Sequence, residues 1–303
     1  MAVQPWQIER KPKRETWAYW FLGPATLMIV LVFIYPLVVA FWTSLHYDVM
    51  VRPTLRHFVG LDNYGAILGE ARFWDSLYAT AFFFVCTVTL TMVLGLIIAL
   101  RLDRDMGRWG WLKPLFLVPM VVTPIVVGIQ WKFMLNSQIG VITYFARLLG
   151  IPVGAWLTEP AGAMFWIVVV DVWQYTPYVI LLFSAGLAAL PVEVKEAARV
   201  DGAGELQVLR FVTLPMLKQV AVTALMIRTI GGLRTFDTIL VLTNGGPGRV
   251  TEVMNLFAYR MGFTAFDLGK ASAIGWLMLI VAFFLVIIYI KILQATAGGE
   301  TYT

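Results

Sequence analysis

The chain has 303 residues, of which 60% are hydrophobic and only 14% are charged, and its mean hydropathy is +0.79. An ordinary soluble domain has about 45–50% apolar and about 25% charged residues, so this composition excludes that class and favours a membrane protein. The net charge of +5 could suit a nucleic-acid-binding protein, but the basic residues are distributed as membrane topology requires, and we expect no nucleic-acid partner.

Six segments meet the requirement of about 20 mostly apolar residues for a helix that crosses a bilayer. We therefore predict an all-α membrane protein with six transmembrane helices. The first apolar segment is too long for a cleaved signal peptide and is followed by five more, so we expect it to be retained. The predicted spans are Trp17–Ser44, Ser76–Leu100, Lys113–Leu135, Gly162–Leu190, Met216–Leu242 and Lys270–Leu293.

Lysine and arginine are unevenly shared between the two sides of this arrangement, with thirteen on the side of the termini and eight on the other. The positive-inside rule therefore places both termini in the cytoplasm. The predicted organisation is a cytoplasmic segment at 1–16, a six-span transmembrane domain at 17–293 and a cytoplasmic tail at 294–303. The rule also places the charged stretch 191–215, between the fourth and fifth spans, in the cytoplasm.

Cysteine and histidine are too scarce to suggest a metal centre. Cys86 is the only cysteine and lies in an apolar run, which excludes an intrachain disulfide and a cysteine cluster. His46 and His57 are the only histidines and share one loop without a nearby cysteine. We therefore expect no metal site in this chain.

The charged stretch PVEVKEAARVDGAGELQVLRFVTLP, Pro191–Pro215, is predicted to fold as helix, turn and helix on the membrane surface. Glu193 near the start of the first helix suits the helix dipole. Asp201-Gly202 is a turn signal, and Glu205–Val212 has apolar residues near helical spacing. The residues alone leave two interpretations open, a docking element for a protein partner or an amphipathic interfacial segment that faces lipid.

Ionisable residues inside a membrane span are costly and indicate function or pairing. Asp171 lies about nine residues into the fourth span, roughly 14 Å, and Arg228 about twelve residues into the fifth, roughly 18 Å from the other side. We predict that both face the protein interior and pair directly or through water. Asp237 follows Arg234 by three residues, so these two can pair along the helix.

The fourth span carries a polar and aromatic stripe. Asp171, Gln174, Tyr175 and Tyr178 have the spacing of one helical face. Hydrogen-bonding groups mixed with aromatic rings suit a sugar or polyol, so these residues, with Arg228 and Asp237, are the candidate substrate path. The competing interpretation is structural: polar contacts that hold the spans together, and an Asp171–Arg228 ion pair.

The charged stretch resembles the EAA loop of binding-protein-dependent ABC importer permeases. Glu196-Ala197-Ala198, Gly202 and Leu214-Pro215 stand in the register of that motif. The resemblance extends over almost the whole chain, to the maltose-type carbohydrate-uptake subfamily and to the permease that is usually encoded first of two. It is carried by YPLVVAFWTSL, FVGLDNY, VPMVVTPIVVGIQWKFM, VWQYTPYVILLFSAGLAALP and FDTILVLTNGGPG.

This resemblance implies a non-enzymatic permease subunit of an importer for a sugar, polyol or sugar derivative, in a bacterial or archaeal cytoplasmic (inner) membrane. Its implied partners are a second permease subunit, two copies of a cytoplasmic ATPase subunit and an extracytoplasmic solute-binding protein, besides membrane lipid. The EAA loop would sit in a groove on the ATPase, with Glu196 as polar anchor, Gly202 as the turn, and Ala197 and Ala198 as the close-contact face.

The chain has no Gly-x-x-x-x-Gly-Lys-Ser/Thr phosphate loop, so ATP and Mg would be bound by the ATPase partner and no catalytic residue is assigned here. Two alternatives stay open. One is an intramembrane enzyme that uses Asp171 with Arg228. The other is an ion-driven secondary transporter, although such folds are commonly built from internal repeats and this sequence shows none.

Overall fold

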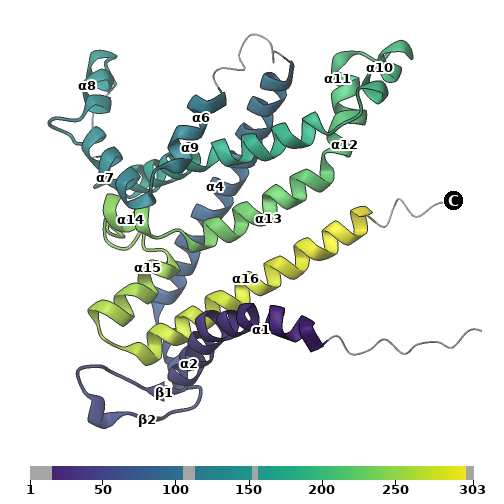
Figure 1. Cartoon of the computed structure of the whole chain (residues 1–303). Coiled ribbons are helices and arrows are strands. Elements are labelled where there is room, and N and C mark those ends of the chain that lie inside the picture. Colours follow the sequence, from purple (N-terminus) through teal and green to yellow (C-terminus); the bar gives the residue numbers. More distant parts are fainter. Residues whose placement is uncertain (1–15, 105–112, 152–155, 298–303) are drawn as a thin grey trace, which may run out of the picture.

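A computed structural model of the chain describes residues 16–104, 113–151 and 156–297, and these are almost entirely helical (Figure 1). The predicted segment 1–16, except Thr16, and residues 298–303 of the predicted tail lie outside the described residues. Two short strands, β1 (His46–Tyr47) and β2 (His57–Phe58), pair antiparallel in the loop after the first span. The predicted all-α fold is confirmed.

Among the described residues, four helical segments are long and apolar enough to cross a membrane, and a bent helix pair makes five if it counts as one span. Four predicted spans match them to within about five residues, close to the error of about 2–4 residues that is expected for predicted helix ends. The first span comprises α1 (Thr16–Ile29), a π-helical turn (Val30–Ile34) and α2 (Tyr35–Ser44). The others are α4 (Ala71–Arg104), α9 (Pro160–Ala188) and α16 (Leu268–Ala297).

The predicted third span is wrong as a single helix, because Lys113–Leu135 contains α6 (Lys113–Val121) and α7 (Pro124–Met134). Thr123 between them has extended backbone angles, φ −64° and ψ 142°. Proline lacks a backbone N–H and disfavours the helical conformation of the residue before it. Pro124 therefore begins a new helix instead of continuing the old one.

The predicted fifth span is also broken. It contains α12 (Leu214–Met216), α13 (Lys218–Arg234) and α14 (Asp237–Leu242), with a bend of 62° where α12 meets α13. Thr235 is extended, with ψ 122°, so α13 ends at Arg234. Arg234 and Asp237 consequently lie on different helices, and no ion pair joins them within the described part of the chain. Their predicted pairing along one helix is wrong.

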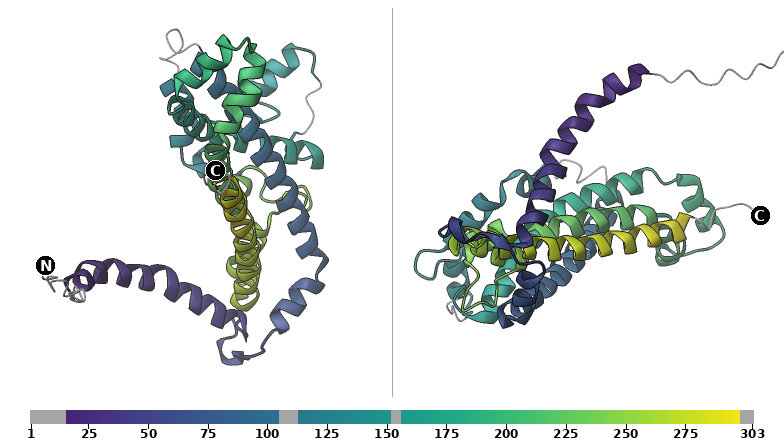
Figure 2. Two further views of the ribbon diagram at one scale, coloured as in Figure 1. Left: turned by 90° about the vertical axis from the view of Figure 1, so that its right-hand side faces the viewer. Right: turned by 90° about the horizontal axis from the view of Figure 1, so that it is seen from below.

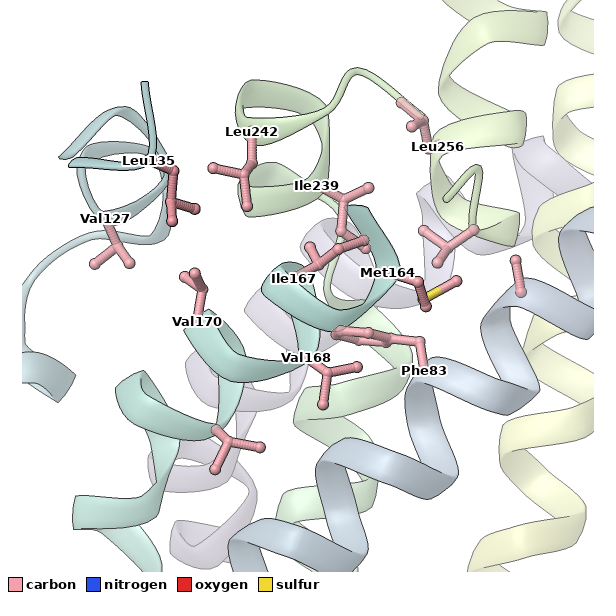
Figure 3. Close-up of a cluster of buried hydrophobic side chains, with 13 residues drawn as sticks. Phe83, Val127, Leu135, Met164, Ile167, Val168, Val170, Ile239, Leu242 and Leu256 are labelled. Atoms are coloured by element: carbon pink, nitrogen blue, oxygen red, sulfur yellow. The ribbon is translucent and has the colours of Figure 1, made fainter. Parts of the chain in front are cut away.

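The main hydrophobic core lies where α4, α7, α9, α14 and α15 (Met254–Tyr259) meet (Figure 3). Phe83 of α4 packs between Met164 and Val168 of α9. Farther along the same pair, a Cβ at position 95 would lie 2.5 Å from the Val179 side chain, so only glycine permits this helix approach. The core fixes the broken third and fifth spans against the continuous fourth.

The two ends of the bundle carry different structures (Figure 1). At one end, the β1–β2 hairpin and α3 (Asp62–Gly69) are tied to the first span, because Asn63 Nδ2 donates to the backbone oxygens of Ser44 and His46 at 2.8 Å. At the other end stand α10 (Val192–Val200), α11 (Glu205–Val208) and a π-helical turn (Leu209–Thr213). We call residues 191–215 the coupling hairpin.

The N-terminal helix leaves the rest of the bundle (Figure 2). Its end, α2, packs on α16, where the Phe41 and Trp276 rings meet edge to face at 5.0 Å. No residue in the most apolar part of Trp20–Ser44 is buried by the rest of the described chain, and Trp20 is 83% exposed. A helix that is apolar all round requires lipid or another protein around it.

Candidate functional site

An ion pair lies in the interior of the bundle, as predicted. Asp171 of α9 and Arg228 of α13 form a salt bridge, and each side chain is only 2% exposed. The Arg228 guanidinium also lies over the Tyr175 ring, 4.9 Å from its centroid, in cation–π geometry. Among the residues that the structure describes, none offers a hydrogen-bond partner to Asp171 Oδ2 or to Arg228 Nε and Nη1. Each charge therefore depends on the other, since an unpaired charge in a low-dielectric interior is strongly disfavoured.

Gln174 makes a hydrogen bond that stabilises the break in the third span. Its side-chain Nε2 donates to the backbone oxygen of Val122 at 3.0 Å, and the side chain is buried. The break leaves that carbonyl without an intrahelical partner, so the amide replaces the lost hydrogen bond. A second side chain also contacts this break, because Thr238 Oγ1 of α14 donates to the Pro124 oxygen at 3.3 Å.

A cavity of about 730 Å³ opens where the fifth span is broken. Its polar lining includes Tyr175, Arg234, Asp237 and Asn255, from four different helices. The volume is in the range of pockets that bury a small organic ligand. Of the six predicted substrate-path residues, Tyr175 and Asp237 line this cavity. Asp171, Gln174 and Arg228 are packed beside it, and Tyr178 does not line it.

Three aromatic rings form one side of the same cavity. The Phe236 and Tyr259 centroids lie 5.7 Å apart, and Tyr259 stacks on Phe263 at 5.1 Å. These three aromatic residues and Asn255 were not identified from the sequence as part of the site. The spacing Asn255, Tyr259 and Phe263, four residues apart each time, could have indicated one helical face. The short apolar run after the Gly-rich turn gave no reason to place that face at a cavity.

A buried carboxylate fixes the loop that connects α14 to α15. Glu252 is fully buried and accepts hydrogen bonds from Arg72 Nε at 2.9 Å, Arg72 Nη2 at 2.7 Å and Arg260 Nη1 at 2.6 Å. Arg260 also donates to the Asn244 backbone oxygen at 2.6 Å, which ties down the TNGGPG turn. Burial opposes the charge, but the two arginines outweigh it, so the pKa of Glu252 lies below its ordinary value of 4.5.

The coupling hairpin has the predicted order of helix, turn and helix. Gly202 has φ +87°, a left-handed conformation that favours glycine, and Arg199 Nε bonds to Glu205 at 3.0 Å across the turn. The second helix is shorter than predicted, since regular α-helix ends at Val208 and a π-helical turn follows. The hairpin is joined to the end of α4 by Lys195 and Asp103, whose charged atoms are 3.6 Å apart.

Most of this hairpin is exposed. Glu196 and Ala197 face solvent with no ion pair to Glu196 in the described residues, and Ala198 is half-buried. Leu214 and Pro215, which close the motif, are also exposed. Val200, Leu206 and Phe211 are 87%, 75% and 68% exposed. An exposed apolar surface next to charged side chains is typical of a site that contacts another protein or the membrane surface. Within the described residues, no cluster of three His, Cys, Asp or Glu side chains could hold a metal ion.

Comparison with known proteins agrees with this geometry. Residues 91–296 match the family described as binding-protein-dependent transport system inner membrane component. The chain is 40% identical over 267 residues to the trehalose/maltose transport system permease protein MalF of Thermococcus litoralis, covering 88% of this chain and 90% of that protein. It is 34% identical to the trehalose transport system permease protein SugA of Mycobacterium tuberculosis, covering 93% and 91%.

The fold is also found in a solved transporter. A chain of the bacterial alginate ABC transporter, crystallised in complex with an alginate pentasaccharide-bound periplasmic protein, superposes with a TM-score of 0.77 at 18% identity, covering 90% of this chain and 92% of that one. The match to the family covers two thirds of the sequence, and the relatives are named permeases of transport systems. The chain belongs to the binding-protein-dependent transport system inner membrane component family and is a membrane-embedded permease of the ABC importer class.

Proposed function

We propose that this permease forms half of the pathway by which an importer carries a sugar, a sugar derivative or a polyol across the cytoplasmic (inner) membrane of a bacterium or archaeon. The names of its relatives support a carbohydrate, since they refer to trehalose, maltose and alginate. The basic residues support an orientation with both termini and the coupling hairpin in the cytoplasm. The observation that carries the choice of solute is the chemistry of the cavity at the helix breaks.

That cavity combines the two kinds of contact that a sugar offers. Asp237, Arg234 and Asn255 supply hydrogen-bond acceptors and donors for hydroxyl groups. The rings of Tyr259 and Phe263 supply flat apolar faces for the C–H surface of a pyranose ring. Backbone that is irregular at membrane depth is tolerated where it lines a cavity, and the break at Thr235–Phe236 is of that kind.

Five of the six residues predicted for the substrate path take one of two roles in this proposal. Tyr175 and Asp237 touch the solute, whereas Asp171, Gln174 and Arg228 hold the helices that form the cavity wall. Gln174 stabilises the break in the third span through its hydrogen bond to Val122. The Asp171–Arg228 pair joins the fourth span to the fifth. Tyr178 lies on α9 but does not line this cavity. Its contact with the solute therefore stays a prediction from the sequence.

The proposed assembly contains a second permease, two ATPase subunits that bind ATP and Mg, and an extracytoplasmic solute-binding protein. The coupling hairpin would be gripped by one ATPase subunit through Glu196, with Ala197 and Ala198 in close contact. Gly202 would make the turn, and Leu214-Pro215 would carry the displacement into α13 at the 62° bend. The Lys195–Asp103 salt bridge gives the same displacement a second route, into α4.

Uptake of radiolabelled sugars into proteoliposomes tests this proposal. The importer is reconstituted with its partner subunits and binding protein, and the Asp237→Asn variant is compared with the Asp62→Asn variant. Asp62 is exposed at the start of α3, away from the cavity. We expect Asp237→Asn to reduce ATP-dependent uptake about tenfold, the effect of one lost hydrogen bond to a charged group, and Asp62→Asn to leave it unchanged. Equal uptake by both variants would remove Asp237 from the path.

A further inference from the structure

A second cavity, of about 780 Å³, lies on the outside of the bundle between α4 and α9. Its α4 wall is one helical stripe that runs from Asp75 to Leu90 and includes Cys86. Its α9 wall runs from Pro160 to Val169, and the side chains between these limits are apolar. The floor is the contact between the two helices, where Met164 and Val168 pack beside Phe83 (Figure 3). We call this cavity the α4–α9 groove.

The groove is about one membrane leaflet deep. Nine residues separate Pro160 from Val169 and fifteen separate Asp75 from Leu90. At 1.5 Å per residue the α9 wall runs for roughly 14 Å and the α4 wall for roughly 22 Å, so the shorter α9 wall sets the length over which both walls are present. Half of the hydrocarbon core of a bilayer is about 15 Å. A span of a partner subunit would cross the full core of about 30 Å and would need walls of that length. The dimension therefore suits an acyl chain from one leaflet better than a second helix.

The groove begins at two exposed charges of opposite sign. Asp75 belongs to the second turn of α4, and Arg249 belongs to the loop after α14. Neither has an ion-pair partner in the described part of the chain. The phenol of Tyr78 lies at the same end, 72% exposed, as aromatic residues do at a membrane surface. The opposite end of α4, at Asp103, contacts the coupling hairpin, so these charges mark the other membrane surface.

We propose that the α4–α9 groove binds a zwitterionic phospholipid, with one acyl chain along its apolar walls. Arg249 binds the lipid phosphate, and Asp75 binds the ammonium group of an ethanolamine or choline headgroup. An anionic phospholipid such as phosphatidylglycerol would satisfy Arg249 through its phosphate but would leave Asp75 without a cationic partner. The proposal rests on the membrane location of the permease, and it is independent of which solute the importer carries.

Cys86 provides a native reporter for this site, because it is the only cysteine of the chain, is partly exposed and lines the groove. The assembled importer is purified in detergent, and phosphatidylethanolamine or phosphatidylglycerol with the same acyl chains is added. The rate at which a small maleimide alkylates Cys86 is then measured by mass spectrometry of the peptide that contains it. Asp75→Asn and Arg249→Gln test the headgroup contacts, and Arg52→Gln removes an exposed charge outside the groove.

We expect phosphatidylethanolamine to slow alkylation about fivefold more than phosphatidylglycerol does, the factor that corresponds to one charge contact near a lipid surface. Asp75→Asn and Arg249→Gln should abolish this difference, and Arg52→Gln should keep it. Equal protection by both lipids would show adventitious annular lipid only and would overturn the proposal. A Cys86 that is unreactive in the assembled importer without added lipid would instead show that protein covers the groove, which also overturns it.

Discussion

Removal of one partner of the Asp171–Arg228 pair should destabilise the permease far more than removal of both. In Asp171→Leu the Arg228 guanidinium would stay in a site where it is 2% exposed, and no other carboxylate of the described residues bonds to it. An uncompensated buried charge typically costs about 3–5 kcal/mol, whereas replacing a whole buried pair by apolar residues is often neutral. We expect about 3 kcal/mol of destabilisation in each single variant, and less than about 1 kcal/mol in Asp171→Leu/Arg228→Met.

The assay is reversible unfolding in mixed micelles, with helical content followed by circular dichroism as the fraction of denaturing detergent rises. A loss of about 3 kcal/mol lowers the ratio of folded to unfolded protein more than a hundredfold, which such a titration resolves. Lys270→Ala is the matched control, because the Lys270–Glu70 pair is about one-third exposed, and exposed pairs contribute at most about 1 kcal/mol. Single variants at residue 171 or 228 that unfold like the control would refute the structural role of the pair.

Two further predictions concern the helix break and the loop carboxylate. Gln174→Ala leaves the Val122 carbonyl without its donor. We therefore expect the free energy of unfolding to fall by about 1–3 kcal/mol in the same titration, with importer assembly intact. A free energy of unfolding within about 0.5 kcal/mol of wild type, roughly the scatter of surface substitutions, would contradict this. Folding lowers the pKa of Glu252, so the stability that its negative charge contributes to the folded protein is fully present above pH 4.5. This stability is lost as the pH falls through the lower pKa of the folded state. Thermal unfolding of wild type should therefore show an acid-dependent loss of stability below pH 4.5 that Glu252→Gln lacks, and parallel pH curves for the two proteins would rule out this linkage.

The interior pair was predictable because it depends on regular helix geometry. Asp171 and Arg228 belong to α9 and α13, which are continuous around these residues, so counting 1.5 Å per residue placed them at matching depth. The outline of the coupling hairpin was predictable for a similar reason, since Asp201-Gly202 is a local turn signal in which glycine accepts the left-handed conformation that the turn requires. In both cases local rules and the final structure agree.

The cavity could not be predicted, because it depends on where helices stop. The sequence from Arg234 to Asp237 has ordinary helical spacing, and only tertiary contacts show that Thr235 is extended and that the chain breaks there. The partner of Gln174 was hidden for the same reason, since a backbone carbonyl becomes available only once Pro124 has interrupted the third span. Pattern reasoning thus found the polar residues and misjudged which of them face open space.

The central claim is that the coupling hairpin is held by an ATPase on the cytoplasmic side, and site-directed cross-linking tests it most directly. In a Cys86→Ala background, Ala197→Cys would be labelled with a short maleimide reagent that carries a photoreactive diazirine, and membranes that contain the whole importer would then be illuminated. The account predicts a cross-link to the ATPase subunit, with a yield that changes when ATP is added, and no cross-link from Val250→Cys at the opposite end of the bundle. Labelling of Ala197→Cys by a membrane-impermeant maleimide applied outside intact cells would contradict the account.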